Sequence, residues 1–172
     1  MGAGMEGDFV SVFILKKSGT DRLDVNFQPV FPAGSNIRKI RVNGLPARDW
    51  GTRVTDQGQV YAEFGFWLDS TATVEILWNG GITALPVVCH PKPDDPSQEL
   101  RIVNTCYSDT TYTISCEGIT GKTYELKVWA AIPGKVKAEG AEIKSIKGNI
   151  ITLQIDFPLA EGKTTVKEIS LN

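Results

Sequence analysis

The sequence predicts an all-β fold, an antiparallel β-sandwich. Short segments with alternating apolar and polar residues recur every 8–12 residues or so, and glycine, asparagine and proline separate them. Helical spacing extends nowhere over more than two turns. The 172 residues include 17 glycines and 9 prolines, and 41% are hydrophobic, which supplies both turns and a core. One large sandwich and two small packed β-domains both fit this pattern.

Proline density predicts where the chain divides. Residues 90–98 contain three prolines, Pro91, Pro93 and Pro96, each without a backbone N–H and each restricting the residue before it. Such a segment does not fit a central strand, so we interpret it as a connector. The expected organisation is an N-terminal β-block at 8–89, the connector at 90–98 and a C-terminal β-block at 99–172.

The N-terminal block begins with a strand that is apolar on both alternating faces, residues 9–17, which predicts burial on both sides. Residues 23–27 alternate as a half-buried strand does, and the proline-containing residues 29–35 are expected to form a loop. Asn43-Gly44 predicts a tight turn after the strand around Ile40 and Val42. The aperiodic residues 45–57 are predicted to be an exposed loop. Further strands are expected at 59–69, 73–78 and 82–88, with a turn at 79–81 and with Val60, Ala62, Phe64, Phe66, Leu68 and Trp78 inward.

The C-terminal block repeats this pattern. Strands are predicted at 100–106, 111–116, 123–131, 149–157 and 164–171, with weaker ones at 135–138 and 142–146. Residues Ile151, Leu153, Ile155 and Phe157 should share one buried face. The spacing from Val166 to Ile169 breaks the alternation and predicts a bulge in the last strand.

Composition and residue types exclude several functions. The formal net charge of -2 offers no basic stripe for nucleic acid. No apolar run approaches the roughly 20 residues of a membrane span, and the N-terminus lacks the pattern of a signal peptide. The single histidine, His90, falls in the connector, as do two neighbouring aspartates, Asp94 and Asp95. No catalytic residue, metal site or cofactor is therefore predicted.

The three cysteines, Cys89, Cys106 and Cys116, have no metal-binding spacing. A Cys106–Cys116 bridge across a hairpin is conceivable, and small buried apolar residues are the favoured interpretation.

Aromatic side chains on polar strand faces are the candidate site. Tyr61, Glu63 and Trp67 share the outer face of one strand, and Trp129 shares a face with Glu125 and Lys127 on another. Trp50 lies in the loop at 45–57. The candidate ligand-binding residues are therefore Trp50, Tyr61, Glu63, Trp67 and Trp129. Flat rings beside acids and arginines suit sugar rings, and the same residue types also suit packing against a neighbouring domain or under the loop.

The segment Thr111–Leu126, with the turn Gly118-Ile119-Thr120-Gly121, resembles a strand-turn-strand pattern of one protein class. That class is the C-terminal accessory β-sandwich of large secreted bacterial glycoside hydrolases and related polysaccharide-utilisation proteins. Gly140–Ile143 and the ending Val166–Leu171 are similar to such a terminal module. The resemblance covers about 70 residues of the C-terminal block and consists mostly of turn glycines and strand alternation.

The resemblance implies a non-catalytic module, not an enzyme, that packs against a catalytic domain or another domain of a longer protein and contacts polysaccharide. It also implies a secreted, periplasmic or cell-surface location. The alternative from another class is a stand-alone carbohydrate-binding or adhesive protein.

Overall fold

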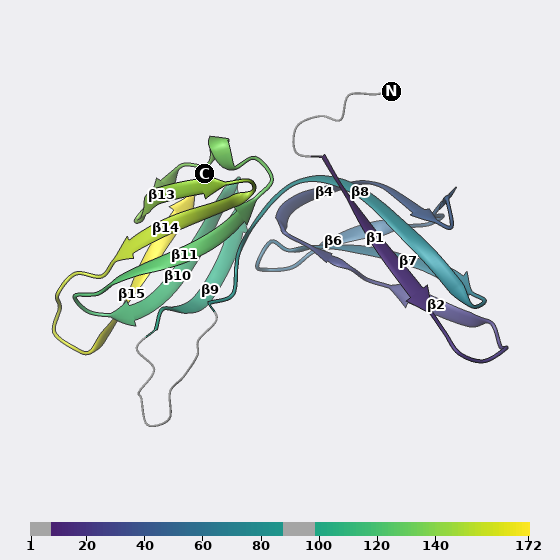
Figure 1. Cartoon of the computed structure of the whole chain (residues 1–172), viewed down its shortest axis with the longest axis horizontal. Coiled ribbons are helices and arrows are strands. Elements are labelled where there is room, and N and C mark those ends of the chain that lie inside the picture. Colours follow the sequence, from purple (N-terminus) through teal and green to yellow (C-terminus); the bar gives the residue numbers. More distant parts are fainter. Residues whose placement is uncertain (1–7, 88–98) are drawn as a thin grey trace. The chain divides into compact units, whose positions relative to one another are not determined.

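The computed structural model describes residues 8–87 and 99–172. Of these residues 67% lie in β-strands, which form antiparallel sheets, so the predicted all-β, sandwich-type fold is confirmed. Two compact units are present, which we call the N-terminal unit (up to Gly81) and the C-terminal unit (from Ile82) (Figure 1). The predicted connector at 90–98 lies outside the described residues, so the boundaries at 89 and 99 stay predictions.

The N-terminal unit is built from two sheets. The first has the order β1, β8, β4, β5, and the second centres on β7, which pairs with β2, β3 and β6. The strands are β1 (Asp8–Lys16), β2 (Leu23–Phe27), β3 (Val30–Phe31), β4 (Ala33–Val42), β5 (Leu45–Pro46), β6 (Gly51–Val54), β7 (Val60–Leu68) and β8 (Thr71–Ala84).

Alternation explains the core of this unit. Val60, Ala62, Phe64 and Leu68 on β7 are buried as predicted, and Phe66 is half-buried. Trp78 on β8 is also buried, and its Nε1–H donates a hydrogen bond to Ser11 Oγ at 2.9 Å. The Asn43-Gly44 turn is confirmed. Both residues have positive φ, 51° and 80°, which matches a two-residue hairpin joining β4 to β5.

Three predictions for this unit are wrong. The first strand is half-buried on one side and exposed on the other, where Val12 lies on the open outer face of the sheet. Residues 29–35 contain β3 and the start of β4, since the two prolines fall just before and between these strands. The turn predicted at 79–81 is absent, because Gly80 and Gly81 adopt positive φ, 71° and 98°, inside the continuous strand β8.

The predicted loop at 45–57 is exposed but not free of regular structure. It holds β5 and β6, and β6 pairs along the edge of β7. β6 therefore lies in the plane of the sheet, next to β7 and its outer face.

The C-terminal unit also has two sheets. One has the order β13, β14, β11 and the last residues of β8, Ile82–Ala84, and the other has the order β12, β15, β10, β9. The strands are β9 (Arg101–Ser108), β10 (Thr111–Ile119), β11 (Thr123–Ala130), β12 (Ala138–Glu139), β13 (Glu142–Lys147), β14 (Ile150–Asp156) and β15 (Thr164–Leu171), with a 3-10 turn at Pro133–Lys135. Strands were predicted near all seven places.

The core of the C-terminal unit follows the predicted alternation of β14, where Ile151, Leu153 and Ile155 are fully buried. The bulge predicted in the last strand is wrong. β15 pairs with β10 in one continuous register, and Lys167 occupies the inward position while Val166 is exposed. The register shifts occur elsewhere, between Ser115 and Cys116 and between Ile143 and Ser145.

The two described cysteines differ in environment. Both side chains are thiols, Cys116 buried and Cys106 exposed, so the preferred interpretation of small buried residues holds for Cys116 and fails for Cys106, whereas Cys89 lies outside the described residues. Burial raises the pKa of the Cys116 thiol to about 11. The thiol therefore stays neutral, and unreactive, far above neutral pH.

We expect iodoacetamide at pH 8 to modify Cys106 and to leave Cys116 intact, as read by peptide mass spectrometry. In denaturant both should react, because unfolding removes the burial that protects Cys116. Equal labelling rates at the two sites in the folded protein would contradict this assignment.

Candidate functional site

The candidate site lies on the outer face of the sheet formed by β2, β7 and β6. Residues directly opposite each other on paired strands share a face. Tyr61 of β7 stands opposite Arg53 of β6, and Trp67 stands opposite Asp24 of β2. Between these two ends, Glu63 is opposite Gly51 and Gly65 is opposite Asn26. The face therefore reads as aromatic, acidic, glycine, aromatic along β7.

A shallow depression of about 510 Å³ lies between the two aromatic ends. It is lined by Asp24, Val25, Asn26, Gln28, Asp49, Gly51, Glu63, Phe64 and Gly65. Gly51 and Gly65 keep its floor low. A Cβ on Gly51 would meet no atom within 4 Å, and one on Gly65 would come no closer than 3.7 Å to the Val25 carbonyl oxygen. A side chain at either position would project into the depression.

An arginine guanidinium lies over each of the two aromatic rings, Trp67 and Tyr61. The Arg22 guanidinium lies 5.1 Å from the Trp67 ring centroid, and that of Arg53 lies 5.2 Å from Tyr61. These arginines are held in turn by carboxylates, Arg22 Nε 3.2 Å from Asp69 Oδ1 and Arg53 Nε 3.3 Å from Glu63 Oε1. Exposed cation–π and ion pairs of this kind are worth only about 0.5–1 kcal/mol each, so a ligand can displace them.

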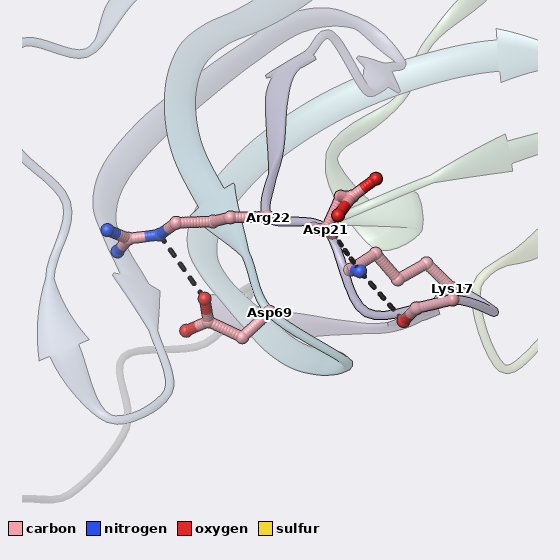
Figure 2. A network of polar contacts seen from close by, with 5 residues as sticks. Lys17, Asp21, Arg22 and Asp69 are labelled. Carbon is pink, nitrogen blue, oxygen red and sulfur yellow. Dashed lines mark hydrogen bonds and ion pairs between the residues drawn. The ribbon is translucent and has the colours of Figure 1, made fainter.

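Figure 2 shows Arg22 with its neighbours Asp69, Asp21 and Lys17. Arg22 extends toward Asp69, and beside it the Lys17 ammonium donates to the backbone oxygen of Asp21 in the turn between β1 and β2. Lys17 also donates to the Gly19 carbonyl oxygen. This turn therefore fixes the start of β2, where Arg22 and Asp24 enter the face.

Three carboxylates, Asp24, Asp49 and Glu63, line the depression. Arg53 pairs with Glu63, and in the part of the chain that the structure describes no cation pairs with Asp24 or Asp49. The same described residues contain no group of three or more His, Cys, Asp or Glu side chains placed to hold a metal ion. Carboxylate and amide oxygens in an open hollow are suited to accept hydrogen bonds from hydroxyl groups.

The five predicted site residues do not all meet. Tyr61, Glu63 and Trp67 lie on one face, with Trp67 54% exposed and the other two half-buried. Trp50 is half-buried and does not line the depression, although its neighbours Asp49 and Gly51 do. Asp49 has a positive φ of 51°, so the chain bends just before Trp50, and strand alternation begins only with Gly51 at the start of β6.

Trp129 belongs to β11 of the C-terminal unit. It is half-buried, in the same alternating set as the exposed Glu125 and Lys127. A hydrogen bond from Lys144 and its charge lower the pKa of Glu125. Trp129 is not among the residues that line the depression.

Sequence reasoning missed Arg22, Asp24, Asn26, Gln28 and Asp49. The polar positions of 23–27 were recognisable from alternation. Their place beside Glu63 and Trp67 depends on the pairing of β2 with β7, which the sequence pattern alone does not give.

In the described part of the chain, no helix has the length and apolar character needed to cross a membrane. No family model matches the chain, and no match is found among curated proteins or solved structures. The geometry of this face is therefore the evidence for function.

Proposed function

We propose that this chain is a non-catalytic accessory β-sandwich protein that contacts polysaccharide through the outer face of β2, β7 and β6. The main support is the row of side chains along β7. In this row Tyr61 and Trp67 lie on either side of an open polar depression whose floor contains glycine. Sugar rings present C–H faces that pack on aromatic rings and hydroxyls that bond to carboxylates and amides.

The dimensions of the row support an extended ligand. Tyr61 and Trp67 are six residues apart on one strand, which corresponds to roughly 20 Å at about 3.3 Å per residue. A single sugar ring is far shorter than this separation. The arrangement therefore suits several consecutive rings of a chain, with the depression receiving those in the middle.

The carboxylates are assigned to hydrogen bonding. Glu63 is already paired with Arg53, and the depression is broad and open rather than a closed cleft that excludes water. The resemblance to accessory modules supports the same view, and with it the expectation of a catalytic partner domain and an extracellular location.

A second candidate function is docking of the same face on a neighbouring domain. It is favoured by the composition of the face, because tryptophan, tyrosine and arginine are the residue types enriched where proteins meet. The two candidates differ in what Trp67 contacts, a glycan or another protein surface.

Affinity electrophoresis against a panel of plant and host polysaccharides tests the proposal. We expect at least one polysaccharide to retard the wild-type chain. Trp67→Ala should weaken that binding roughly tenfold or more, since losing one stacking aromatic side chain costs about 1.4 kcal/mol or more. Trp129→Ala is the control, because Trp129 lies on the C-terminal unit, and it should leave retardation unchanged.

Absence of retardation by every polysaccharide would contradict glycan binding and leave domain docking as the better account. Shortening of the retarding polysaccharide during incubation would contradict the non-catalytic assignment.

A further inference from the structure

The edge strand β1 carries three exposed apolar side chains on the outer face of its sheet. Val10, Val12 and Ile14 are 61%, 57% and 65% exposed. Among the residues that the structure describes, β8 is the strand with which β1 pairs, so its other edge carries no strand. The edge runs for nine residues, from Asp8 to Lys16, without a register shift. Long, regular, apolar edges of this kind are templates for pairing with another strand.

The other long edge strands carry the features that prevent such pairing. In β9 the register with β10 shifts near Ser115, and in β13 the register with β14 shifts between Ile143 and Ser145. β13 also bears three charged residues, Glu142, Lys144 and Lys147. β1 has no charge between its two end residues. The edge of β1 therefore lacks the features that hinder strand pairing at the edges of β9 and β13.

The hydrogen bonds between β1 and β8 show which backbone groups of β1 can pair with another strand. Lys17 N–H donates to the Ser70 carbonyl oxygen, so residues at odd positions of β1 bond to β8. The Thr73 carbonyl, opposite Ile14, bonds instead to Asn43 on the β4 side, in agreement with this phase. The N–H and C=O groups of the even positions, Val10, Val12 and Ile14, therefore point away from the sheet.

We propose that β1 pairs antiparallel with β1 of a second copy of this chain, about a two-fold axis at Val12. In this register Val12 faces Val12 of the second copy, Val10 faces Ile14, and Asp8 faces Lys16. These three pairs consist of even positions, so the outward backbone groups of the two strands meet. The opposite charges at the strand ends, with only uncharged residues between them, make the strand complementary to itself.

The charges at the strand ends favour this register over the registers shifted by one residue. A shift of the two-fold axis to Ser11 would place Asp8 opposite Ile14, and a shift to Phe13 would place Lys16 opposite Val10. Both shifts separate Asp8 from Lys16 and place a charge opposite an apolar side chain. Asp8 already accepts hydrogen bonds from Arg38 through both carboxylate oxygens, at 3.4 and 3.3 Å, so Lys16 of the second copy would approach an ordered carboxylate.

The pairing would also cover half-buried residues on the inner face. Phe9 would stand opposite Leu15 of the second copy, and Ser11 opposite Phe13. All four are partly exposed at the edge of the core, so the two-fold pairing would extend both cores across the new interface.

Sedimentation velocity of the full chain over a concentration series tests the proposal. We expect a reversible dimer for the wild type. Val12→Lys should weaken association roughly tenfold or more, because it places two like charges opposite each other at the axis. Val54→Lys, at an exposed valine of β6 (62% exposed), is the matched control and should dimerise as the wild type does. Circular dichroism establishes that all three chains are folded.

Amide hydrogen exchange by NMR gives the register. In the dimer the amides of Val10, Val12 and Ile14 should exchange more slowly at high than at low protein concentration. A monomer up to about 1 mM would overturn the proposal. So would a dimer that Val12→Lys leaves intact, or concentration-dependent protection confined to other strands. Because β1 lies outside the glycan-binding face, none of these results bears on the proposed function.

Discussion

Replacing Gly140 with alanine is expected to lower the free energy of unfolding by about 2–4 kcal/mol. Gly140 lies between β12 and β13 with φ +82°, a conformation that costs an L residue about 1–2 kcal/mol. A Cβ at this position would lie 2.4 Å from the Glu168 carbonyl oxygen and 3.4 Å from Ile169 Cα. Both are backbone atoms of β15, so the neighbour has no rotamer with which to move aside.

Urea denaturation followed by circular dichroism measures this effect. Gly134→Ala is the matched control, because a Cβ there would meet nothing within 4 Å and the backbone is not in the left-handed region. That substitution should change stability by less than about 1 kcal/mol. Equal midpoints for the two variants would contradict the position of Gly140 against β15.

Replacing Trp78 with alanine should cost about 3–5 kcal/mol, the usual range for a large aromatic core residue. Trp78 is 7% exposed and packs on Phe9, with ring centroids 4.9 Å apart, and on Phe31 at 5.3 Å. Its loss would also remove the hydrogen bond to Ser11. The substitution should therefore weaken the packing of β1 and of β3 at the same time.

Trp67→Ala provides the comparison, since Trp67 is 54% exposed and contacts Arg22 at the surface. The same denaturation experiment should show a loss of no more than about 1 kcal/mol for this variant. If both tryptophan substitutions destabilised the protein equally, the assignment of Trp78 to the core and Trp67 to the surface would be wrong.

Much of the fold was predictable because side-chain alternation reports burial directly. It located the buried faces of β7 and β14, and Asn43-Gly44 located a hairpin. It failed for β1, because an apolar strand buried on both faces and an apolar strand at a sheet edge have the same pattern. It failed at Gly80-Gly81, because glycine can continue a strand through positive φ as well as end it.

The site was predictable only in part, for a related reason. Residues on one strand, such as Tyr61, Glu63 and Trp67, share a face by alternation alone. Residues on different strands come together through pairing register, which depends on the whole sheet. Asp24 and Gly51 were therefore not foreseen, and Trp129 was grouped with residues of a different unit.

The central claim is that glycan binds on the face between Tyr61 and Trp67. Its most direct test is an NMR titration of the ¹⁵N-labelled chain with oligosaccharides from the polysaccharide that retards it most. We predict shifts of the Trp67 indole N–H and of the Gly65 and Gly51 amides, with the Trp129 indole unchanged. Shifts that cluster on the C-terminal unit, or that leave the signals of Trp67 and Gly65 in place at saturation, would contradict the claim.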